Sequence, residues 1–362
     1  MSETVATHTG KQHYAVLDGL RGSAALLVVA FHIQGIPISF QPGQLLLSHA
    51  HLAVDFFFAL SGFVIGYAYD DRWGAMTTLR FFRVRLARLH PLVVLGALLG
   101  FASYLFDPFA AGAQAAPLGS VFVALLLGML LLPASPLPNR WTDTHTLNGP
   151  SWTLLQEYIG NIAYALVLRR LPTRALALLA LVAAAVLAWV ALANGTLDRG
   201  WGWENFWLGT VRLAFPFMAG LWLHRVHARL PALRLGFLPL TIVLVAAFAA
   251  PLFGMTGAIN ANGLYEAGCV IVLFPLILVA GAHSQAGRGF DRLCRLAGEL
   301  SYPLYITHFP FLYVWENYVA HAHPSPAKAG LIACLIFPFV IAVAWVAYRF
   351  WDLPIRRYLA RR

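Results

Sequence analysis

Two residues of the first apolar segment have the types and spacing to do chemistry inside a membrane. Arg21 and His32 are eleven positions apart, and Asp18 lies just before the arginine. Eleven steps of an α-helix are three turns plus about 20°, so both side chains share one face, about 16 Å apart along the axis. A cation at one depth and a titratable base deeper on the same face predict a polar track. The spacing fits equally well a charge that anchors the helix and a histidine that bonds a neighbouring helix.

A second group of polar residues follows a helical repeat in the segment after Pro150. Thr153, Glu157 and Asn161 recur every four residues and therefore lie on one face. An ionisable group at membrane depth costs about 2.5–3.5 kcal/mol on insertion scales, so each is a functional hypothesis. Glu157 is expected to form the wall of a site, with an interhelical hydrogen-bond clamp as the alternative. Arg212, in another apolar segment, is a candidate partner for this carboxylate.

Two further segments carry isolated ionisable groups. Asp55 lies in the run 54–62, where a structural role near the outer end of the segment is favoured over catalysis. Tyr305 and His308 are three residues apart and share a helix face, after Ser301, which is a good helix N-cap. Pro310, inside the same segment, predicts a kink that frees backbone carbonyls. His308 is therefore expected to add a second buried histidine to the polar track.

Arginines are concentrated before the third apolar segment. Arg80, Arg83, Arg85 and Arg88 precede His90-Pro91. A membrane anchor needs fewer positive charges, and guanidinium groups suit bidentate binding of phosphates. Phosphate binding, to a cofactor or to lipid headgroups, is therefore slightly favoured over anchoring alone.

The chain offers little support for a metal site. Its three cysteines are scattered and show no metal-binding spacing. The pairs His49/His51 and His321/His323 could each bind an ion, but isolated pairs of this kind in loops are usually solvated. We therefore expect no metal.

Composition decides the fold class. The chain has 362 residues, of which 60% are hydrophobic and 11% charged, whereas soluble domains average about 45–50% and 25%. Long apolar runs without alternation exclude a β-barrel, and backbone in lipid must then be helical. The sequence predicts an all-α, polytopic membrane bundle in the plasma membrane, which is the inner membrane of a bacterium. The net charge of +10 is clustered beside apolar segments, so it indicates topology rather than nucleic-acid binding.

The apolar segments and basic clusters define a topology. The segments fall near 15–35, 51–68, 91–106, 118–134, 151–168, 174–194, 205–224, 236–253, 263–282, 303–320 and 329–349. The positive-inside rule places the basic connections near 80–88, 169–174, 225–234, 288–295 and 356–362 in the cytoplasm. Three segments lie between the first two of these connections, and an odd number cannot join two cytoplasmic loops. We therefore predict about ten spans, one non-spanning segment between 91 and 168, and cytoplasmic termini. The predicted divisions are an N-terminal segment 1–13, a membrane domain 14–350 and a basic tail 351–362.

In order along the chain, these motifs resemble the membrane acyltransferase-3 family, whose members O-acylate sugars and other acceptors with acyl-CoA. The resemblance covers nearly the whole length. It rests on Asp18 to Gly22 with His32, Asp55 to Gly62, Arg85 and Arg88 before His90-Pro91, Ser151-Trp152 with Glu157, Arg212, Ser301 to His308, and Asp352 to Arg357. The arginine cluster reads R-x-R-x-x-R and position 352 is Asp, where the family often has R-x-x-x-R and Glu.

The resemblance implies roles for these residues. Acyl transfer from a thioester to a hydroxyl needs a base, a cradle for the donor's phosphates and donors to the oxyanion. His32 is expected to be the base, or alternatively the nucleophile that carries the acyl group. Arg21, helped by Arg85 and Arg88, would bind acyl-CoA. Glu157 would orient His32 or bind the acceptor, and His308 would donate to the carbonyl oxygen or hold the acceptor.

These predictions assign the candidate residues as follows. Catalysis is assigned to His32, Arg21, Glu157 and His308, donor binding to Arg21, Arg85 and Arg88, and substrate binding to Glu157, Asn161, Arg212 and Tyr305. The expected donor is acyl-CoA, with acetyl as the acyl group. The expected acceptor is a carbohydrate hydroxyl, for instance of an exopolysaccharide, O-antigen or other cell-envelope glycan. The competing class is a transporter or flippase of a glycan or lipid-linked intermediate, which would also hold ionisable groups in the membrane.

Overall fold

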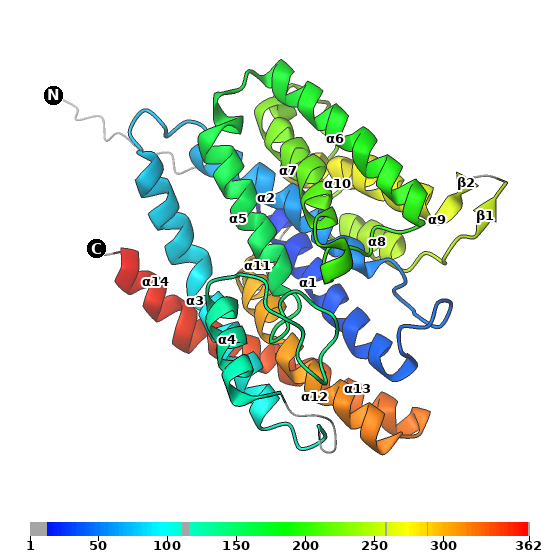
Figure 1. Ribbon diagram of the computed structural model, residues 1–362. Coiled ribbons are helices and arrows are strands. Elements are labelled where there is room, and N and C mark those ends of the chain that lie inside the picture. Colours follow the sequence, from blue (N-terminus) through cyan, green and yellow to red (C-terminus); the bar gives the residue numbers. More distant parts are fainter. Residues whose placement is uncertain (1–12, 111–115, 258, 288, 361–362) are drawn as a thin grey trace.

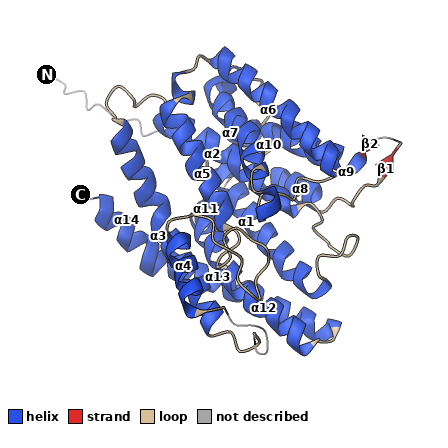
Figure 2. Ribbon diagram, in the orientation of Figure 1, coloured by secondary structure: helices blue, strands red, loops and turns tan. Residues whose placement is uncertain are grey.

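A computed structural model describes residues 13–110, 116–257, 259–287 and 289–360. Most of the described chain is helical, with loops between the helices (Figure 2), as predicted. It also has a short antiparallel ribbon of β1 (Met255–Thr256) and β2 (Ile259–Asn260), in which Met255 pairs with Asn260. This ribbon projects from one side of the bundle beyond α9 (Figure 1).

The helices follow the apolar segments of the sequence closely. Their bounds are α1 (Ala15–Gly35), α2 (Ala53–Tyr69), α3 (Thr78–Leu105), α4 (Leu118–Met129), α5 (Ser151–Leu166), α6 (Thr173–Asn194), α7 (Leu208–Val226), α8 (Phe237–Phe248), α9 (Ala261–Gly268), α10 (Phe274–His283), α11 (Phe290–Thr307), α12 (Phe309–Ala322), α13 (Pro326–Val346) and α14 (Leu353–Ala360). Short 3₁₀ turns add η1 (Ile36–Ile38), η2 (Ala50–Leu52), η3 (Leu168–Arg170), η4 (Trp203–Asn205) and η5 (His227–Arg229), and π-helical turns add η6 (Cys269–Leu273) and η7 (Ala347–Asp352).

Six helices of the described chain are long and apolar enough to cross a membrane. They are Ala15–Ile38, Ala50–Tyr69, Thr78–Leu105, Thr173–Asn194, Ala261–His283 and Pro326–Leu359. Between the arginines of α3 and those after α5, α4 is the shortest helix, with 12 residues. At 1.5 Å per residue it is about 18 Å long, well short of the ~30 Å hydrocarbon core. Leu131 has a positive φ of 57° just after α4, so the predicted segment 118–134 does not continue as helix.

Two local predictions need correction. The arginine run 80–88 is not a connection but the first turns of α3, because Thr77 caps the helix by accepting from the Arg80 N–H at 3.2 Å. Ser301 is not an N-cap, since α11 begins at Phe290, and its hydroxyl instead donates to Gly298 O at 2.7 Å. Helix continues from α13 through η7 into α14, and the division of the chain at residue 351 remains a prediction. The predicted kink is confirmed, since the helix breaks at His308 between α11 and α12.

Small residues bring the central helices into close contact. A Cβ at Gly62 of α2 would lie 2.0 Å from Phe217 O of α7, and one at Gly220 of α7 would lie 2.0 Å from Ala59 O of α2. Likewise, a Cβ at Gly22 of α1 would lie 2.4 Å from the Cβ of Ala297 on α11. Membrane helices pack through small residues because lipid supplies no hydrophobic drive for their association. These contacts fix α1 against α11 and α2 against α7, and these helices carry Arg21, His32, Tyr305 and Arg212.

Candidate active site

Two cavities are lined by seven of the nine predicted site residues. The first, which we term the arginine cavity, has a volume of about 380 Å³ and is lined by charged and polar side chains that include Arg21, Ser61, Arg85, Arg88, Glu157, Ser301, Tyr302, Tyr305, Asp352 and Arg356. The second, which we term the histidine cavity, has a volume of about 600 Å³ and is lined by His32, His51, Trp141, Asp143, Arg199, Arg212, Glu266, Tyr305 and Phe309 among others. Val54 and Tyr305 line both cavities, so the two meet at these side chains.

Arg21 is held at the wall of the arginine cavity by α11. Its Nε donates to Ser301 Oγ at 3.0 Å and its Nη2 to Gly298 O at 2.8 Å, while Asp18 lies 3.0 Å away one turn earlier. The close packing of α1 on α11 makes these contacts reachable. Arg21 is therefore fixed in orientation with about a quarter of its side chain exposed.

Glu157 pairs with Arg85, not with Arg212 as predicted. Arg85 Nη2 lies 2.7 Å from Glu157 Oε1, and the Ser61 hydroxyl donates to the same oxygen at 2.8 Å. The carboxylate therefore belongs to the arginine cavity. Its Oε1 contacts Arg85 and Ser61 rather than His32. That Glu157 orients His32 or binds the acceptor remains a prediction.

The last helix, α14, also contributes side chains to the arginine cavity. Arg356 of α14 lies 2.9 Å from Asp352, and both side chains line the cavity together with Arg88, whose side chain is exposed. The sequence showed Arg356 only as part of a basic tail. Four guanidinium groups, those of Arg21, Arg85, Arg88 and Arg356, thus converge from three helices. No periodicity could indicate this, because α14 reaches the cavity only through the fold.

His32 and His308 are brought together at the histidine cavity. His32 Nδ1 and His308 Nε2 are 3.1 Å apart, and the rings are stacked at 14°. His308 Nδ1 lies 3.0 Å from Leu304 O, and since a carbonyl only accepts, this nitrogen carries the proton. For two neutral rings, His308 Nε2 must then accept from His32 Nδ1–H. His32 is left with an unprotonated Nε2, the form that a general base requires.

Tyr305 lies where the two cavities meet. Its hydroxyl lies 3.1 Å from Thr153 Oγ1, and Thr153 lies one turn before Glu157 on α5. One side of Tyr305 therefore faces the guanidinium groups and the other faces the imidazoles. The prediction that Tyr305 contacts substrate remains a prediction.

Arg212 forms a buried ion pair with Asp55. Its Nη2 lies 2.6 Å from Asp55 Oδ2 and its Nε 3.2 Å from Oδ1, a bidentate contact. It also donates to Arg199 O at 2.8 Å and to His51 O at 3.0 Å, so it fixes two loops beside the histidine cavity. Asn161, by contrast, lines neither cavity, and its amide donates to the Glu157 backbone oxygen at 2.6 Å.

The loop between α4 and α5 supplies residues that the sequence did not reveal. Trp141 and Asp143 line the histidine cavity, and the Tyr313 hydroxyl donates to Asp143 Oδ2 at 2.7 Å. Burial raises the pKa of Asp143 to about 7, although the hydrogen bond from Tyr313 opposes the shift. Burial also lowers the pKa of His145, in the same loop, to about 4. An isolated acid in a polar loop gave no signal in the sequence, since its burial depends on the fold.

Comparison with known proteins decides the family. The family model described as an acyltransferase domain matches residues 14–349. The chain belongs to the acyltransferase-3 family. It is 28% identical to the acyltransferase MdmB of Streptomyces mycarofaciens over 375 aligned residues, which cover 96% of this chain and 92% of that protein. It is 36% identical to protein 2 in the picA locus of Rhizobium radiobacter over 171 residues, which cover 42% of this chain and 82% of that protein. No solved structure matches the chain.

The protein is thus a membrane acyltransferase, in agreement with its motifs and its long apolar helices. Its fold presents a cationic cavity and a cavity lined by His32, which meet at Val54 and Tyr305.

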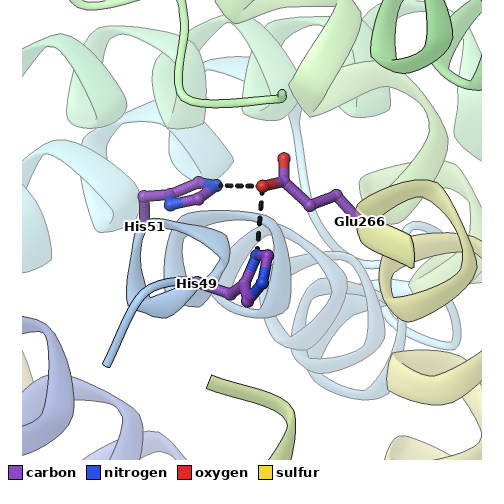
Figure 3. Close-up of side chains that lie close together, drawn as sticks. All are labelled: His49, His51 and Glu266. Atoms are coloured by element: carbon purple, nitrogen blue, oxygen red, sulfur yellow. Dashed lines mark hydrogen bonds and ion pairs between the residues drawn. The ribbon is translucent and has the colours of Figure 1, made fainter. Parts of the chain in front are cut away.

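The expectation that the pair His49/His51 is solvated is wrong. His49 and His51 are not a solvated pair but are buried, with 0% and 8% of their side chains exposed. Figure 3 shows both rings turned toward Glu266 of α9. The pair His321/His323 is exposed, as expected.

Proposed function

We propose that the protein transfers an acetyl group from acetyl-CoA to a hydroxyl of a cell-envelope carbohydrate, with the donor in the arginine cavity and the acceptor in the histidine cavity. The observation that carries the proposal is the meeting of a cavity with four arginines and a cavity with a free histidine nitrogen at Tyr305 and Val54.

The arginine cavity suits the phosphates of coenzyme A. Guanidinium groups bind phosphate oxygens bidentately and stay charged near an apolar environment. Arg21 and Arg85 are already oriented by Ser301 and Glu157, so little side-chain freedom is lost when the donor binds. The pantetheine arm of the donor would then extend past Tyr305, along the roughly 16 Å of α1 that separates Arg21 from His32.

The histidine pair suits the transfer step. His32 Nε2 takes the proton of the acceptor hydroxyl while the oxygen of that hydroxyl attacks the thioester carbonyl. The C–S bond then breaks, and the proton passes to the leaving thiolate of coenzyme A. His308 keeps His32 in the required tautomer and stabilises the imidazolium that forms. In the alternative route His32 Nε2 attacks the thioester carbonyl first and the C–S bond breaks to release the coenzyme A thiolate. The acyl-imidazole then passes the acyl group to the acceptor oxygen, and the proton of the acceptor hydroxyl goes to the thiolate.

We also propose a multi-pass position in the inner membrane with about ten spans and both termini in the cytoplasm. The clusters of arginine at the ends of the helices support this topology. A reporter that fluoresces only in the cytoplasm, fused after Arg362, is expected to be bright. Lack of fluorescence with normal protein levels would refute the cytoplasmic C-terminus.

The decisive test is turnover of radiolabelled acetyl-CoA by the purified protein in nanodiscs. Wild type is compared with Arg21→Ala, His32→Ala and Glu157→Ala at matched amounts of folded protein, with His321→Ala as an exposed-histidine control. We expect His32→Ala to lose turnover but keep donor binding, Arg21→Ala to lose donor affinity, and His321→Ala to match wild type. Equal turnover in all five proteins, or no coenzyme A binding by any, would overturn the proposal.

A further inference from the structure

A cluster of two histidines and a glutamate lies outside the proposed catalytic pair. His49 and His51 flank the start of η2, and Glu266 lies on α9, more than two hundred positions further along the chain. The side chains of His49 and Glu266 are fully buried, and that of His51 is 8% exposed (Figure 3). The three donor atoms lie within 4.8 Å of one another.

The donor atoms have the spacing of ligands around one ion. Glu266 Oε1 lies 3.1 Å from His49 Nδ1 and 3.2 Å from His51 Nε2. A tetrahedral site with bonds of about 2.0–2.1 Å has ligand–ligand edges of about 3.3–3.4 Å. Small movements of the side chains would therefore place all three atoms around a common centre.

The tautomer of His49 directs a lone pair into the cluster. Its Nε2 lies 3.2 Å from Pro251 O, and because a carbonyl only accepts, this nitrogen carries the proton. In the neutral ring, Nδ1 is then unprotonated and faces the carboxylate oxygen at 3.1 Å. Two lone pairs at this distance repel unless a cation lies between them. Metal-bound histidines are typically fixed in this way by a carbonyl at the other nitrogen.

His51 presents a second imidazole nitrogen to the same carboxylate oxygen. Its Nε2 is buried and has no hydrogen-bond partner among the described residues, because the contact with Glu266 does not meet hydrogen-bond geometry. A buried nitrogen without a hydrogen-bond partner destabilises the fold. Coordination to an ion would remove that cost.

Further hydrogen bonds fix the carboxylate of Glu266, and the cluster borders the histidine cavity. The Leu197 N–H donates to Glu266 Oε2 at 2.5 Å, and the Asn262 amide donates to Oε1 at 3.0 Å. Both His51 and Glu266 line the histidine cavity. A fourth coordination position would therefore face that cavity and could hold water.

We propose that His49, His51 and Glu266 bind one divalent transition-metal ion, with zinc the preferred ion. Two imidazoles and one carboxylate with an open fourth position are a donor set found in zinc sites, and imidazole also suits other first-row metals. The ion would join the start of α2 to α9 at the edge of the histidine cavity. This proposal does not depend on the acceptor or the donor of the acyl transfer.

The test measures metal in the full-length protein purified in detergent without metal-affinity chromatography. Bound metals are quantified by mass spectrometry, and the chelator-treated protein is titrated with Zn²⁺ and with Co²⁺, whose visible absorption reports tetrahedral coordination. The variants are His51→Ala and Glu266→Gln, and the matched control is the double variant His321→Ala/His323→Ala, which removes an exposed pair of the same spacing.

We expect about one zinc per chain in wild type and in the control variant, and a tetrahedral cobalt spectrum in both. Loss of a residue that merely orients a ligand costs about 10–100-fold in metal affinity, so loss of His51 should cost at least about 100-fold. Glu266→Gln serves if His51→Ala does not fold. Wild type that binds neither ion, or that binds them as weakly as His51→Ala, would show a proton-bridged cluster and overturn the proposal.

Discussion

The arginine cavity and the histidine cavity share helices α1 and α11 but present different side chains. Helix α1 gives Arg21 to the first and His32 to the second, and α11 gives Ser301 to the first and Tyr305 to both. Each cavity is lined by an arginine that pairs with a carboxylate, Arg85 in the first and Arg212 in the second. Of the two cavities, the second is the one lined by His32, whose ring bonds that of His308. On the proposed function, the distance along α1 from Arg21 to His32 separates donor binding from proton transfer.

The largest expected effect is loss of the reaction in His32→Ala. Removal of a general base typically lowers the rate by about 10²–10⁴-fold. Donor affinity should stay at the wild-type value, because the arginine cavity is untouched. Single-turnover transfer and equilibrium binding of acetyl-CoA measure the two separately. A parallel loss of both would show that the two cavities are not functionally separate.

The next effect concerns stability. Asp55→Asn leaves Arg212 buried without its counter-ion, and breaking a buried pair costs about 3–5 kcal/mol. Glu157→Gln breaks the pair in the arginine cavity, where the carboxylate is 19% exposed, so a smaller loss is expected. Thermal unfolding in detergent compares the two variants. A larger loss of stability in Glu157→Gln would contradict the expectation that the fully buried pair of Arg212 and Asp55 contributes more to stability.

His308→Ala is expected to have an intermediate effect. It leaves His32 Nδ1–H without a partner, which costs about 1–3 kcal/mol, or roughly 5–150-fold in turnover. His308→Gln, which can still accept a hydrogen bond, should recover part of the loss. Turnover rates of wild type and the two variants, measured at matched amounts of folded protein, test this expectation. Equal rates in His308→Ala and wild type would exclude a positioning role.

Asp143 should make stability depend on pH. Its pKa is about 7 in the folded protein, against about 3.9 for an unfolded chain. Between these values the unfolded state has lost the proton that the folded state keeps, so stability falls as pH rises and levels off above about 7. The slope approaches 1.4 kcal/mol per pH unit. Asp143→Asn should remove this dependence, as measured by thermal unfolding from pH 5 to 8. An unchanged pH profile in that variant would contradict the assignment.

The smallest effect is expected for Arg88→Ala. Arg88 is exposed at the arginine cavity, so loss of one phosphate contact should cost about 1 kcal/mol, or roughly fivefold in donor affinity. The rate with saturating donor should not change. Isothermal titration with coenzyme A measures the affinity, and a decrease in the saturated rate would place Arg88 in the histidine-dependent step instead.

The sequence predicted helices well and partners poorly. Helix positions followed from apolar runs, and the break beside Pro310 followed from its missing N–H. The pairing of Arg212 with Glu157 was wrong because several carboxylates, Asp55 and Glu157 among them, lie in apolar segments and cannot be told apart by composition. The burial of His49 and His51 was missed because a short pair in a connection gives no sign of the helix that covers it.

The sequence by itself determined the family, the membrane character and which residues share a helix face, since these depend on composition and on the local geometry of 3.6 residues per turn. Only the tertiary structure decided the partners. The contacts of Arg85 with Glu157, Arg212 with Asp55, His49 with Glu266 and His32 with His308 span 72, 157, 217 and 276 positions. Contacts over such separations depend on how helices pack, and packing is set by the shapes of many side chains together rather than by any one segment.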